Sequence, residues 1–324
     1  MAKKIPNIVK EIRNNPPSEI NFAFQKNISY SQMSIFRNCP HRWKLQYKDK
    51  IKRFTSSIHT VFGTAVHEAM QHYLDVSYEK SFAAADREIN MEEYFQEKFI
   101  GEYQNQYKKN NNEHFSDAVE MREFFEDGVA ILEWFKKKRS AYFSKKGTYL
   151  VGCELPIVVA PNKMLNNVLY MGYLDVVTYH EGTDTFKIID IKTSTKGWNE
   201  YAKKDEDKQF QLLLYKQYFS EQYGIPLDKI EIEFFILKRK VLDWDDENLL
   251  SPYQAHRVQT FTPPSGKIKL NRAKTAISSF INECFNSNGD IKDTIYPKTP
   301  SKWTCTFCPY REDTELCGAG LDFS

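Results

Sequence analysis

The chain has 324 residues, of which 41% are hydrophobic and 15% aromatic, so it can bury a sizeable core and is not expected to be disordered. Its 45 Lys and Arg residues nearly balance its 43 Asp and Glu residues, and the formal charge of +2 does not by itself predict nucleic-acid binding. The N-terminus, MAKKIPNIVKEIRNNPP, lacks the apolar region of a signal peptide, and no run approaches the roughly 18 apolar residues of a membrane span. Six cysteines in such a chain suggest metal ligands or free thiols rather than a disulfide framework.

The first half of the chain is predicted to be helical. Its apolar residues recur at intervals of three and four, which is typical of helices with one buried face. Proline interrupts this spacing where a helix must end. The expected elements are a loosely structured lead-in at 1–28, two short helices within 31–47 joined at Cys39–Pro40, a helix at 63–76 that begins at Gly63, and two long helices within 83–143 with a loop near Lys109–Glu113.

The character of the sequence changes at Thr148, where β-branched and aromatic runs separated by turn-prone segments indicate strands. Helical spacing then returns and alternates with a further strand. The expected elements are strands at 149–159, 168–179 and 186–192, a helix at 208–223, a strand at 231–238, a helix near 272–285 and a cysteine-bearing tail from Pro297. This order predicts an α/β core preceded by a helical lobe.

The segment KIIDIKTS places Asp190 and Lys192 two residues apart at the end of an apolar strand, so both side chains project from the same face. Asp175, in GYLDVV, lies on the preceding strand. Carboxylates in apolar runs need compensation, which Mg²⁺ or Mn²⁺ provides. Lys192 could then orient an attacking water or neutralise charge that develops on a phosphate. The alternative is an ordinary surface ion pair, because a D-x-K tripeptide is common.

Further residues favour a catalytic interpretation over that alternative. His67 follows the small residues of GTAVHEAM, which would let a helix approach the sheet and bring an imidazole to a metal. Gln211 and Tyr215 are four residues apart and share one helix face, from which both could contact a phosphate or the lysine. Glu154 could supply another carboxylate or a supporting contact. Each feature alone is also compatible with a structural role.

The order of these motifs resembles the RecB-type nucleases of the PD-(D/E)XK superfamily. The matching segments are GTAVH (63–67), GYLD (172–175), DIKT (190–193) and QLLLY (211–215). The resemblance implies metal-dependent cleavage of phosphodiester bonds. It implies His67, Asp175, Asp190 and the backbone carbonyl of Ile191 as metal ligands, Lys192 as the catalytic lysine, and Gln211 and Tyr215 as residues that line the site.

Cys305, Cys308 and Cys317 form C-x2-C-x8-C near the C-terminus, and the C-x2-C knuckle commonly gives two thiolates to one metal. Cys39 is the best candidate for a fourth ligand. The residues themselves do not decide between three possibilities: an iron–sulfur cluster, a zinc ion and unligated thiols. Resemblance to the iron–sulfur members of the family, which are AddB-like and CRISPR-associated exonucleases, implies a 4Fe–4S cluster, although the gap before Cys317 is longer than usual. Cys153 and Cys284 are expected to be buried free thiols.

The resemblance also implies a fold class: an α/β protein with a restriction-endonuclease-like core, in which helices flank a mixed central sheet. A helical N-terminal lobe and an iron–sulfur clasp that joins the termini complete it. The corresponding segments are a lead-in at 1–28, a lobe carrying Cys39 and His67 at 29–147, a nuclease core at 148–290 and a cysteine clasp at 291–324.

Two basic clusters are candidates for contact with nucleic acid. The segment 37–53 interleaves seven Lys or Arg with aromatic residues, and there we expect cations along phosphates and rings on unpaired bases. For the second cluster we favour a solvated helix face. The acidic residues at 243–247 would keep DNA away from other surfaces. The aromatic residues of the first cluster are Phe36, Trp43, Tyr47 and Phe54, and the second cluster comprises Lys136–Arg139, Lys145 and Lys146 around Tyr142 and Phe143.

We therefore expect a nuclease that uses Mg²⁺ or Mn²⁺ and acts as an exonuclease on single-stranded DNA or DNA ends in recombination, repair or replication. The alternatives are a structure-specific or defence endonuclease and a non-catalytic DNA-binding subunit of a larger complex. Recombination, helicase or CRISPR-type proteins are the expected partners, and a bacterial cytoplasm, including one infected by a phage, the expected location. The sequence contains no G-x-x-x-x-G-K-[ST] motif for ATP-driven translocation.

Overall fold

The computed structural model of the protein describes residues 5–21, 23–51, 53, 56–143, 146–242 and 255–318. The chain forms two compact units, each built from separate stretches of sequence. Unit 1 comprises Met1–Pro16, Ser56–Pro156 and Tyr173–Pro264, and unit 2 comprises Pro17–Thr55, Ile157–Gly172 and Ser265–Ser324. Cys39 and His67, which the sequence-based division placed in one lobe, belong to different units. No helix within the described ranges has the length and apolar character to cross a membrane.

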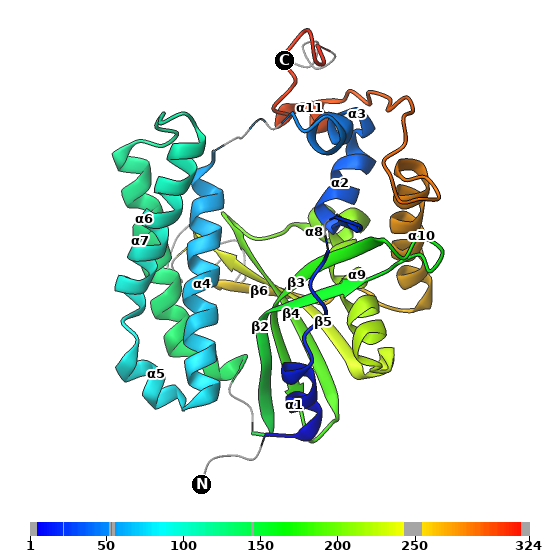
Figure 1. The fold of residues 1–324 in the computed structure, drawn as a ribbon. Coiled ribbons are helices and arrows are strands. Elements are labelled where there is room, and N and C mark those ends of the chain that lie inside the picture. The colour runs from blue at the N-terminus through cyan, green and yellow to red at the C-terminus, as the bar shows by residue number, and fades with distance from the viewer. Residues whose placement is uncertain are drawn as a thin grey trace. The chain divides into compact units, whose positions relative to one another are not determined.

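Helix α4 is the central helix of unit 1, and α6 and α7 pack along it (Figure 1). Its buried face includes Val66, Met70 and Tyr73, which are fully removed from solvent. The expectation that this helix begins at Gly63 is wrong, because the helical backbone already starts at Ile58 after Ser57. The prediction of two long helices within 83–143 is also incomplete, because a short helix precedes them. The bounds are α4 Ile58–Glu79, α5 Phe82–Glu88, α6 Met91–Lys109 and α7 Ala118–Lys138, with the loop after Lys109 as expected.

The ends of these helices follow from their capping residues. The side chain of Asn90 accepts a hydrogen bond from the backbone N–H of Glu93 at the start of α6, and Asp117 accepts from Val119 and Glu120 at the start of α7. Lys136, Lys137 and Lys138 occupy the last turn of α7, where positive charge complements the helix dipole.

The sheet is mixed, and its main pairings lie in unit 1. Strands β3 and β4 are antiparallel, with Val176 opposite Ile189, and β4 and β5 are parallel, with Asp190 opposite Phe234. Strand β6 is antiparallel to β5, and β2 pairs with β3. The bounds are β2 Thr148–Val159, β3 Val168–His180, β4 Thr185–Ser194, β5 Ile230–Lys238 and β6 Val258–Phe261, which confirms the four predicted strands and adds β6.

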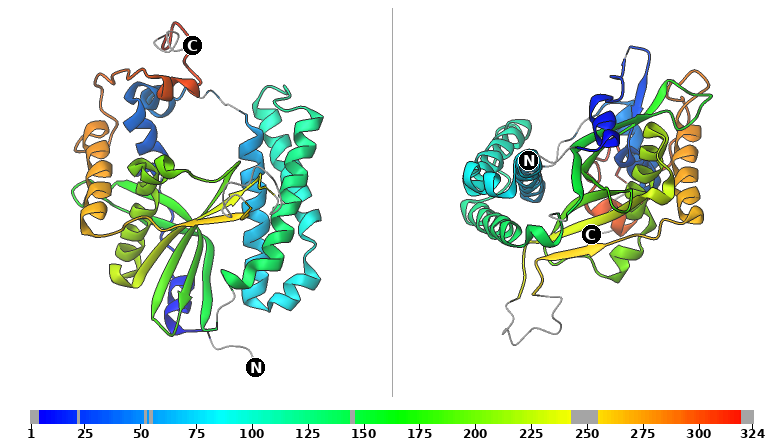
Figure 2. Two further views of the ribbon diagram at one scale, coloured as in Figure 1. Left: turned by 180° about the vertical axis from the view of Figure 1, so that it is seen from behind. Right: turned by 90° about the horizontal axis from the view of Figure 1, so that it is seen from below.

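Helices cover both faces of this part of the sheet. Ile189 and Ile191 of β4 belong to the same buried cluster as the inner residues of α4, α6 and α7. Side chains alternate along a strand, so Phe186 faces the other way and packs on Phe219 of α9, with ring centroids 5.5 Å apart. Figure 2 shows α4 to α7 as a group beside the strands of unit 1. The remaining helices of this unit are α1 Asn7–Asn14, α8 Glu200–Lys204 and α9 Glu206–Tyr223.

Unit 2 is held together by an aromatic core. Trp43 is fully buried and lies edge-on to Phe280, with ring centroids 5.5 Å apart, while Tyr296 packs against the same indole at the same distance. The two short helices joined at Cys39 are confirmed, whereas the lead-in is more ordered than expected because it contains α1 and β1. The bounds are β1 Lys26–Ile28, α2 Tyr30–Asn38, α3 Pro40–Trp43, the π-helix Lys44–Lys48, α10 Lys267–Cys284 and α11 Lys302–Thr306.

Candidate functional site

Asp190 and Lys192 form the centre of the candidate site, which lies within unit 1. Asp190 is 1% exposed, and its Oδ2 atom lies 2.8 Å from Nζ of Lys192. Its other carboxylate oxygen, Oδ1, accepts no hydrogen bond from the part of the chain that the structure describes. Burial raises the pKa of Asp190, although the Lys192 charge opposes this shift. A buried carboxylate oxygen without a donor is a costly group that a cation would stabilise.

Asp175 lies on β3 and its carboxylate faces the backbone of β4. Its Oδ2 atom accepts a hydrogen bond from the backbone N–H of Ile191 at 2.7 Å. Burial and the charge of Asp190 raise the pKa of Asp175 well above its ordinary value, because two carboxylates in one buried site repel each other. The two acids and Ile191, which sequence reasoning selected, are therefore neighbours in the structure.

His67 reaches the same place from α4. Its Nδ1 atom lies 3.8 Å from Oδ2 of Asp175. Burial, with a smaller contribution from the charge of Lys192, lowers the pKa of His67 to about 3, so the imidazole is neutral at neutral pH and keeps a lone pair for a ligand. The close approach of the helix depends on Gly63, because a Cβ atom there would lie only 3.2 Å from Oγ1 of Thr193 on β4.

Gln71 is a member of this site that sequence reasoning missed. It lies four residues after His67 on α4 and therefore on the same face of the helix, which is the signal that could have identified it. Its side-chain amide donates hydrogen bonds to Oε1 of Glu154 at 2.6 Å and to the backbone carbonyl of Asp175 at 3.0 Å. Gln71 thus connects the helix to two acidic residues at once.

Glu154 has an unusual backbone conformation, with φ at +48° inside strand β2. Few residues other than glycine adopt this left-handed region, and such conformations cost free energy that the surrounding structure must supply. The hydrogen bond from Gln71 is one contact that holds Glu154 there. The Glu154 carboxylate lies close enough to the site for its charge to contribute to the raised pKa of Asp175.

Gln211 and Tyr215 come together on α9, as their spacing predicted. The amide of Gln211 donates a hydrogen bond to the Tyr215 hydroxyl at 3.3 Å. Burial and the charges of Asp190 and Asp175 raise the pKa of Tyr215, although the hydrogen bond from Gln211 opposes the shift. The phenol therefore remains protonated at neutral pH and can donate a hydrogen bond.

The arrangement concentrates negative charge beside one ammonium group. Carboxylate and imidazole donors suit Mg²⁺ or Mn²⁺ in kind. Among the residues described, however, no three His, Cys, Asp or Glu side chains already converge tightly enough to hold a metal ion. Lys192 neutralises part of this negative charge through its ion pair with Asp190.

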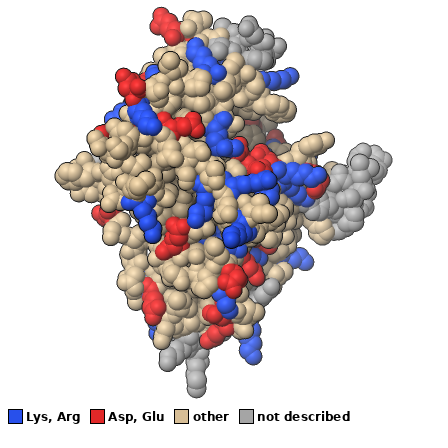
Figure 3. All heavy atoms as spheres, turned by 90° about the vertical axis from the view of Figure 1, so that its right-hand side faces the viewer, with Lys and Arg blue, Asp and Glu red and all other residues tan. Residues whose placement is uncertain are grey.

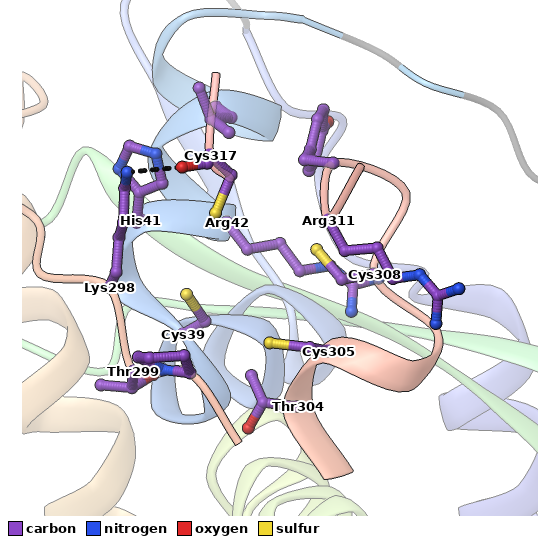
Figure 4. Close-up of a pocket in the computed structure, with 13 residues that line it drawn as sticks. Cys39, His41, Arg42, Lys298, Thr299, Thr304, Cys305, Cys308, Arg311 and Cys317 are labelled. Carbon is purple, nitrogen blue, oxygen red and sulfur yellow. Dashed lines mark hydrogen bonds between the residues drawn. The ribbon is translucent and has the colours of Figure 1, made fainter. Parts of the chain in front are cut away.

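Unit 2 contains the cysteine cluster that the sequence predicted. Cys39, Cys305, Cys308 and Cys317 line one pocket, and none of them forms a disulfide. Figure 4 shows their sulfur atoms facing a shared space. Cys39 lies at the junction of α2 and α3, and Cys305 lies within α11. The four thiols are thus assembled from sequence positions that are far apart.

Hydrogen bonds attach the cysteine-bearing tail to the segment around Cys39. The hydroxyl of Thr299 donates to the carbonyl of Asn38 at 2.5 Å, and Nε2 of His41 lies 2.9 Å from the carbonyl of Leu316. Arg42 lines the cysteine pocket, and its buried Nε atom has no hydrogen-bond partner among the described residues. The tail is therefore bound to α2 and α3 through contacts that involve no cysteine side chain.

The other two cysteines lie outside this pocket. Cys153 is on β2, with its sulfur 3.8 Å from the carbonyl oxygen of Gln71, and burial and the neighbouring Asp75 raise the pKa of its thiol. Cys284 is fully buried on α10, and burial also raises the pKa of its thiol. Both therefore remain protonated at neutral pH and are poor nucleophiles.

The first basic cluster is less available than its sequence suggested. Lys44 pairs with Asp49 at 2.5 Å, Lys48 pairs with Asp293 at 2.7 Å, and Arg53 pairs with Asp313. On the face drawn in Figure 3, Asp and Glu side chains likewise lie beside many of the Lys and Arg side chains. Lys52, Phe54, Lys145 and the acidic segment 243–247 lie outside the described residues.

The expectation that Phe36 and Trp43 stack on bases is wrong. Phe36 is 6% exposed and Trp43 is fully buried, and their rings contact each other in the core of unit 2. Their helical spacing reflects core packing rather than a binding surface. In the second cluster, Lys136 and Arg139 both pair with Asp86.

Comparison with known proteins adds one result. The family model described as the PD-(D/E)XK nuclease superfamily matches residues 27–313. That match covers most of the chain, including His67, both aspartates and Lys192. No curated protein matches the chain.

Proposed function

Because the chain belongs to the PD-(D/E)XK nuclease superfamily, we propose that it is an exonuclease that acts on single-stranded DNA or at DNA ends. Membership implies a metal-dependent nuclease with DNA as its substrate and a divalent ion such as Mg²⁺ or Mn²⁺ as its cofactor. The preference for single strands and ends is our extension of this, and it rests on the resemblance of the motifs to RecB-type nucleases.

The observation that carries the proposal is the buried pair of acids. Asp190 keeps a carboxylate oxygen without a hydrogen bond, and Asp175 has a raised pKa beside it. His67, Asp175, Asp190 and the carbonyl of Ile191 would hold the divalent ion. When bound, such an ion acts as a Lewis acid and lowers the pKa of water. The neutral imidazole of His67 and the two carboxylates have the donor chemistry that this requires.

Lys192 would act directly on the scissile phosphate or on the attacking water. Burial lowers its pKa, but the charges of Asp190 and Asp175 outweigh that effect and raise it on balance. The ammonium group therefore stays charged at neutral pH. It can hold a water in position by donating a hydrogen bond, or it can neutralise charge that develops on the phosphate in the transition state.

Gln211 and Tyr215 would bind a phosphate oxygen beside Lys192. Tyr215 remains protonated, and Gln211 fixes the orientation of its hydroxyl through the hydrogen bond between them. Glu154 would act as a supporting carboxylate, because Gln71 and the strained backbone hold it in place at the site.

For unit 2 we propose that Cys39, Cys305, Cys308 and Cys317 bind a 4Fe–4S cluster, with a zinc ion as the alternative. Four thiols that line one pocket favour a metal site of either kind, although no three of these four described residues already converge tightly enough to hold an ion. Arg42 lines the same pocket, and its positive charge would offset the negative charge of four thiolates. The iron content and visible absorption of anaerobically purified protein distinguish the two metals.

Exonuclease activity in recombination, repair or replication is the role we favour for a bacterial or phage-encoded protein of this type. A structure-specific or defence endonuclease would use the same residues. A DNA-binding subunit without activity is disfavoured by the charged set around Asp190, because a binding module has no use for a buried, destabilising pair of acids.

The test uses end-labelled linear and circular single-stranded DNA, with Mg²⁺ or Mn²⁺ compared against EDTA. Metal-dependent loss of the linear substrate, abolished in Lys192→Ala, would establish the nuclease. Survival of the circle would establish the exonuclease, whereas its cleavage would favour the endonuclease. If neither substrate is cut while DNA binding is intact, the protein is a binding subunit.

A further inference from the structure

Two large aromatic side chains of unit 2 project into solvent beside the cysteine pocket. Trp303 is 91% exposed and Phe307 is 85% exposed. Trp303 lies in α11, and Phe307 is the C-cap residue that follows the helix. The two residues are four positions apart, a spacing that favours placement on one side of a helical turn. Cys305 lies between them in sequence and is buried toward the pocket. The segment formed by α11 and its C-cap therefore directs the thiol of Cys305 into the pocket and exposes two aromatic rings to solvent.

These two rings are the most exposed of the tryptophan and phenylalanine residues that the structure describes in unit 2, ahead of Phe24 at 76%. Phe36, Trp43 and Phe280 are buried and contact one another. A single exposed hydrophobic residue needs no explanation, but two adjacent aromatic rings that are almost fully exposed mark a contact surface.

The backbone that carries the two rings is held in a defined position. The side chain of Ser301 caps α11 by accepting a hydrogen bond from the backbone N–H of Thr304 at 3.0 Å. Cys305 and Cys308, on either side of Phe307, point into the pocket. A binding surface that is ordered before its ligand arrives loses less conformational entropy on binding.

The charge of unit 2 indicates what the rings contact. Unit 2 contains seventeen Lys or Arg residues against nine Asp or Glu residues, whereas unit 1 contains twenty-eight against thirty-four. Lys302 is exposed beside Trp303. The guanidinium of Arg311 donates a hydrogen bond to the carbonyl of Thr306 at 3.3 Å, next to the second ring. It also pairs with Glu312 at 3.0 Å, so Lys302 is the more available cation. Cations beside exposed rings are the combination that binds single-stranded nucleic acid, because phosphates meet the cations and unpaired bases stack on the rings.

We propose that Trp303 and Phe307 form a stacking platform for the unpaired bases of single-stranded DNA. The inference rests on the proposed nuclease function, to which it adds a binding surface outside the candidate active site. It assigns the contact to the outer side of α11 rather than to the aromatic residues of 36–47. The platform reads no base sequence, since every base has a flat face.

The test compares the affinity for an oligo(dT) strand of Trp303→Ala, Phe307→Ala and the double variant by fluorescence anisotropy. Each protein carries Lys192→Ala and is assayed in EDTA, so that cleavage does not interfere. Each single variant should bind roughly tenfold more weakly, as expected for the loss of one stacked base, and the double variant more weakly still. Tyr201→Ala is the matched control, because this tyrosine is 86% exposed but lies in unit 1. Trp303→Phe should retain most of the affinity.

Four outcomes are informative. Selective loss of single-strand affinity, with blunt duplex affinity, thermal stability and iron or zinc content unchanged, supports the platform. Wild-type DNA affinity in the double variant overturns the platform. A loss of self-association with unchanged DNA affinity also overturns it, and would show that the rings form a protein interface. Absence of DNA binding by the Lys192→Ala parent, together with absence of cleavage by the wild-type protein in Mg²⁺ or Mn²⁺, would instead refute the proposed function. Both proteins are assayed in parallel, so this result is distinguishable from failure of the platform.

Discussion

The side-chain amide of Gln71 lies 2.6 Å from a carboxylate oxygen of Glu154, so a residue of α4 holds a residue of β2 whose backbone has a φ of +48°. The same amide also donates to the backbone of Asp175. A single helix therefore presents His67 to the candidate metal site and also positions the acids that surround it.

Gln71→Ala should lower kcat by roughly 10- to 100-fold, as is typical when a group that orients metal ligands is removed. Its effect on DNA affinity should be small, because Gln71 touches the acids and not the proposed substrate. Steady-state cleavage and anisotropy measurements separate the two quantities. Gln104→Ala, at an exposed position on α6, is the matched control. A Gln71→Ala enzyme with wild-type kcat would show that Glu154 needs no such support.

Lys192→Ala should reduce cleavage by about 100-fold or more, since it removes a positive charge next to the proposed reacting phosphate. The fold and DNA affinity should persist. Lys187→Ala is a suitable control, because Lys187 lies on the same strand and pairs with Glu233 at 2.7 Å but is outside the candidate site. Equal losses in both variants would argue that strand β4 was perturbed rather than the chemistry.

Asp175→Asn should stabilise the metal-free protein at neutral pH. Burial and the charge of Asp190 raise the pKa of Asp175 in the folded state. A carboxyl group whose pKa is raised by folding contributes its full stabilisation of the folded state below its unfolded pKa, about 3.9. This stabilisation is lost as the pH rises through the pKa of the folded state. The neutral amide introduced by the substitution does not ionise, so the variant avoids this loss of folding free energy, which amounts to about 1.4 kcal/mol for each unit by which the pKa is raised.

Chemical denaturation in EDTA across the acid range measures this effect. The advantage of Asp175→Asn should be largest near neutral pH and should disappear as the pH falls toward about 4, where the native carboxyl is also protonated. Asp184→Asn, on an exposed turn where hydrogen bonds from Tyr179 and Lys229 lower the pKa, should show no such gain. A gain that does not depend on pH would rule out titration of Asp175 as its cause.

Substitution of Cys39, Cys305, Cys308 or Cys317 by serine should each lower the metal content, because each thiol contributes to one pocket. Cys284→Ala should retain the metal, since Cys284 is buried on α10 away from the pocket residues. Metal analysis after anaerobic purification gives the result directly. Retention of full metal content in Cys317→Ser would remove that residue from the ligand set and leave the other three in place.

Local sequence pattern was sufficient for the four longer strands and for several residues of the candidate site, but not for β1, β6 or Gln71. Asp175, Asp190 and Lys192 lie on strands whose apolar runs are unmistakable, and His67 lies on a strongly periodic helix. The start of α4 at Ile58 was missed because Gly63 resembles a helix boundary, whereas its lack of a side chain serves the close approach to Thr193. Helical spacing cannot separate these two uses of glycine.

Local sequence pattern could not reveal which side chains are buried or which distant segments of the chain pack together. Phe36 and Trp43 are interleaved with cations, as stacking residues would be, yet they face Phe280 from a distant part of the chain. Trp303 has no distinguishing local pattern, but its exposure in the fold sets it apart. The two units also draw on several separate stretches each, so consecutive segments could not describe them.

The hydrogen bonds that attach the tail to Asn38 and His41 have a consequence for maturation of the protein. They involve a hydroxyl, an imidazole and backbone carbonyls, and so they can form before any metal arrives. If the pocket holds the cluster that we propose, the newly made chain would present its four thiols as a prepared acceptor, and a cluster assembled elsewhere would be delivered as the last step. Damage by oxygen could likewise be repaired in place, without refolding of the unit.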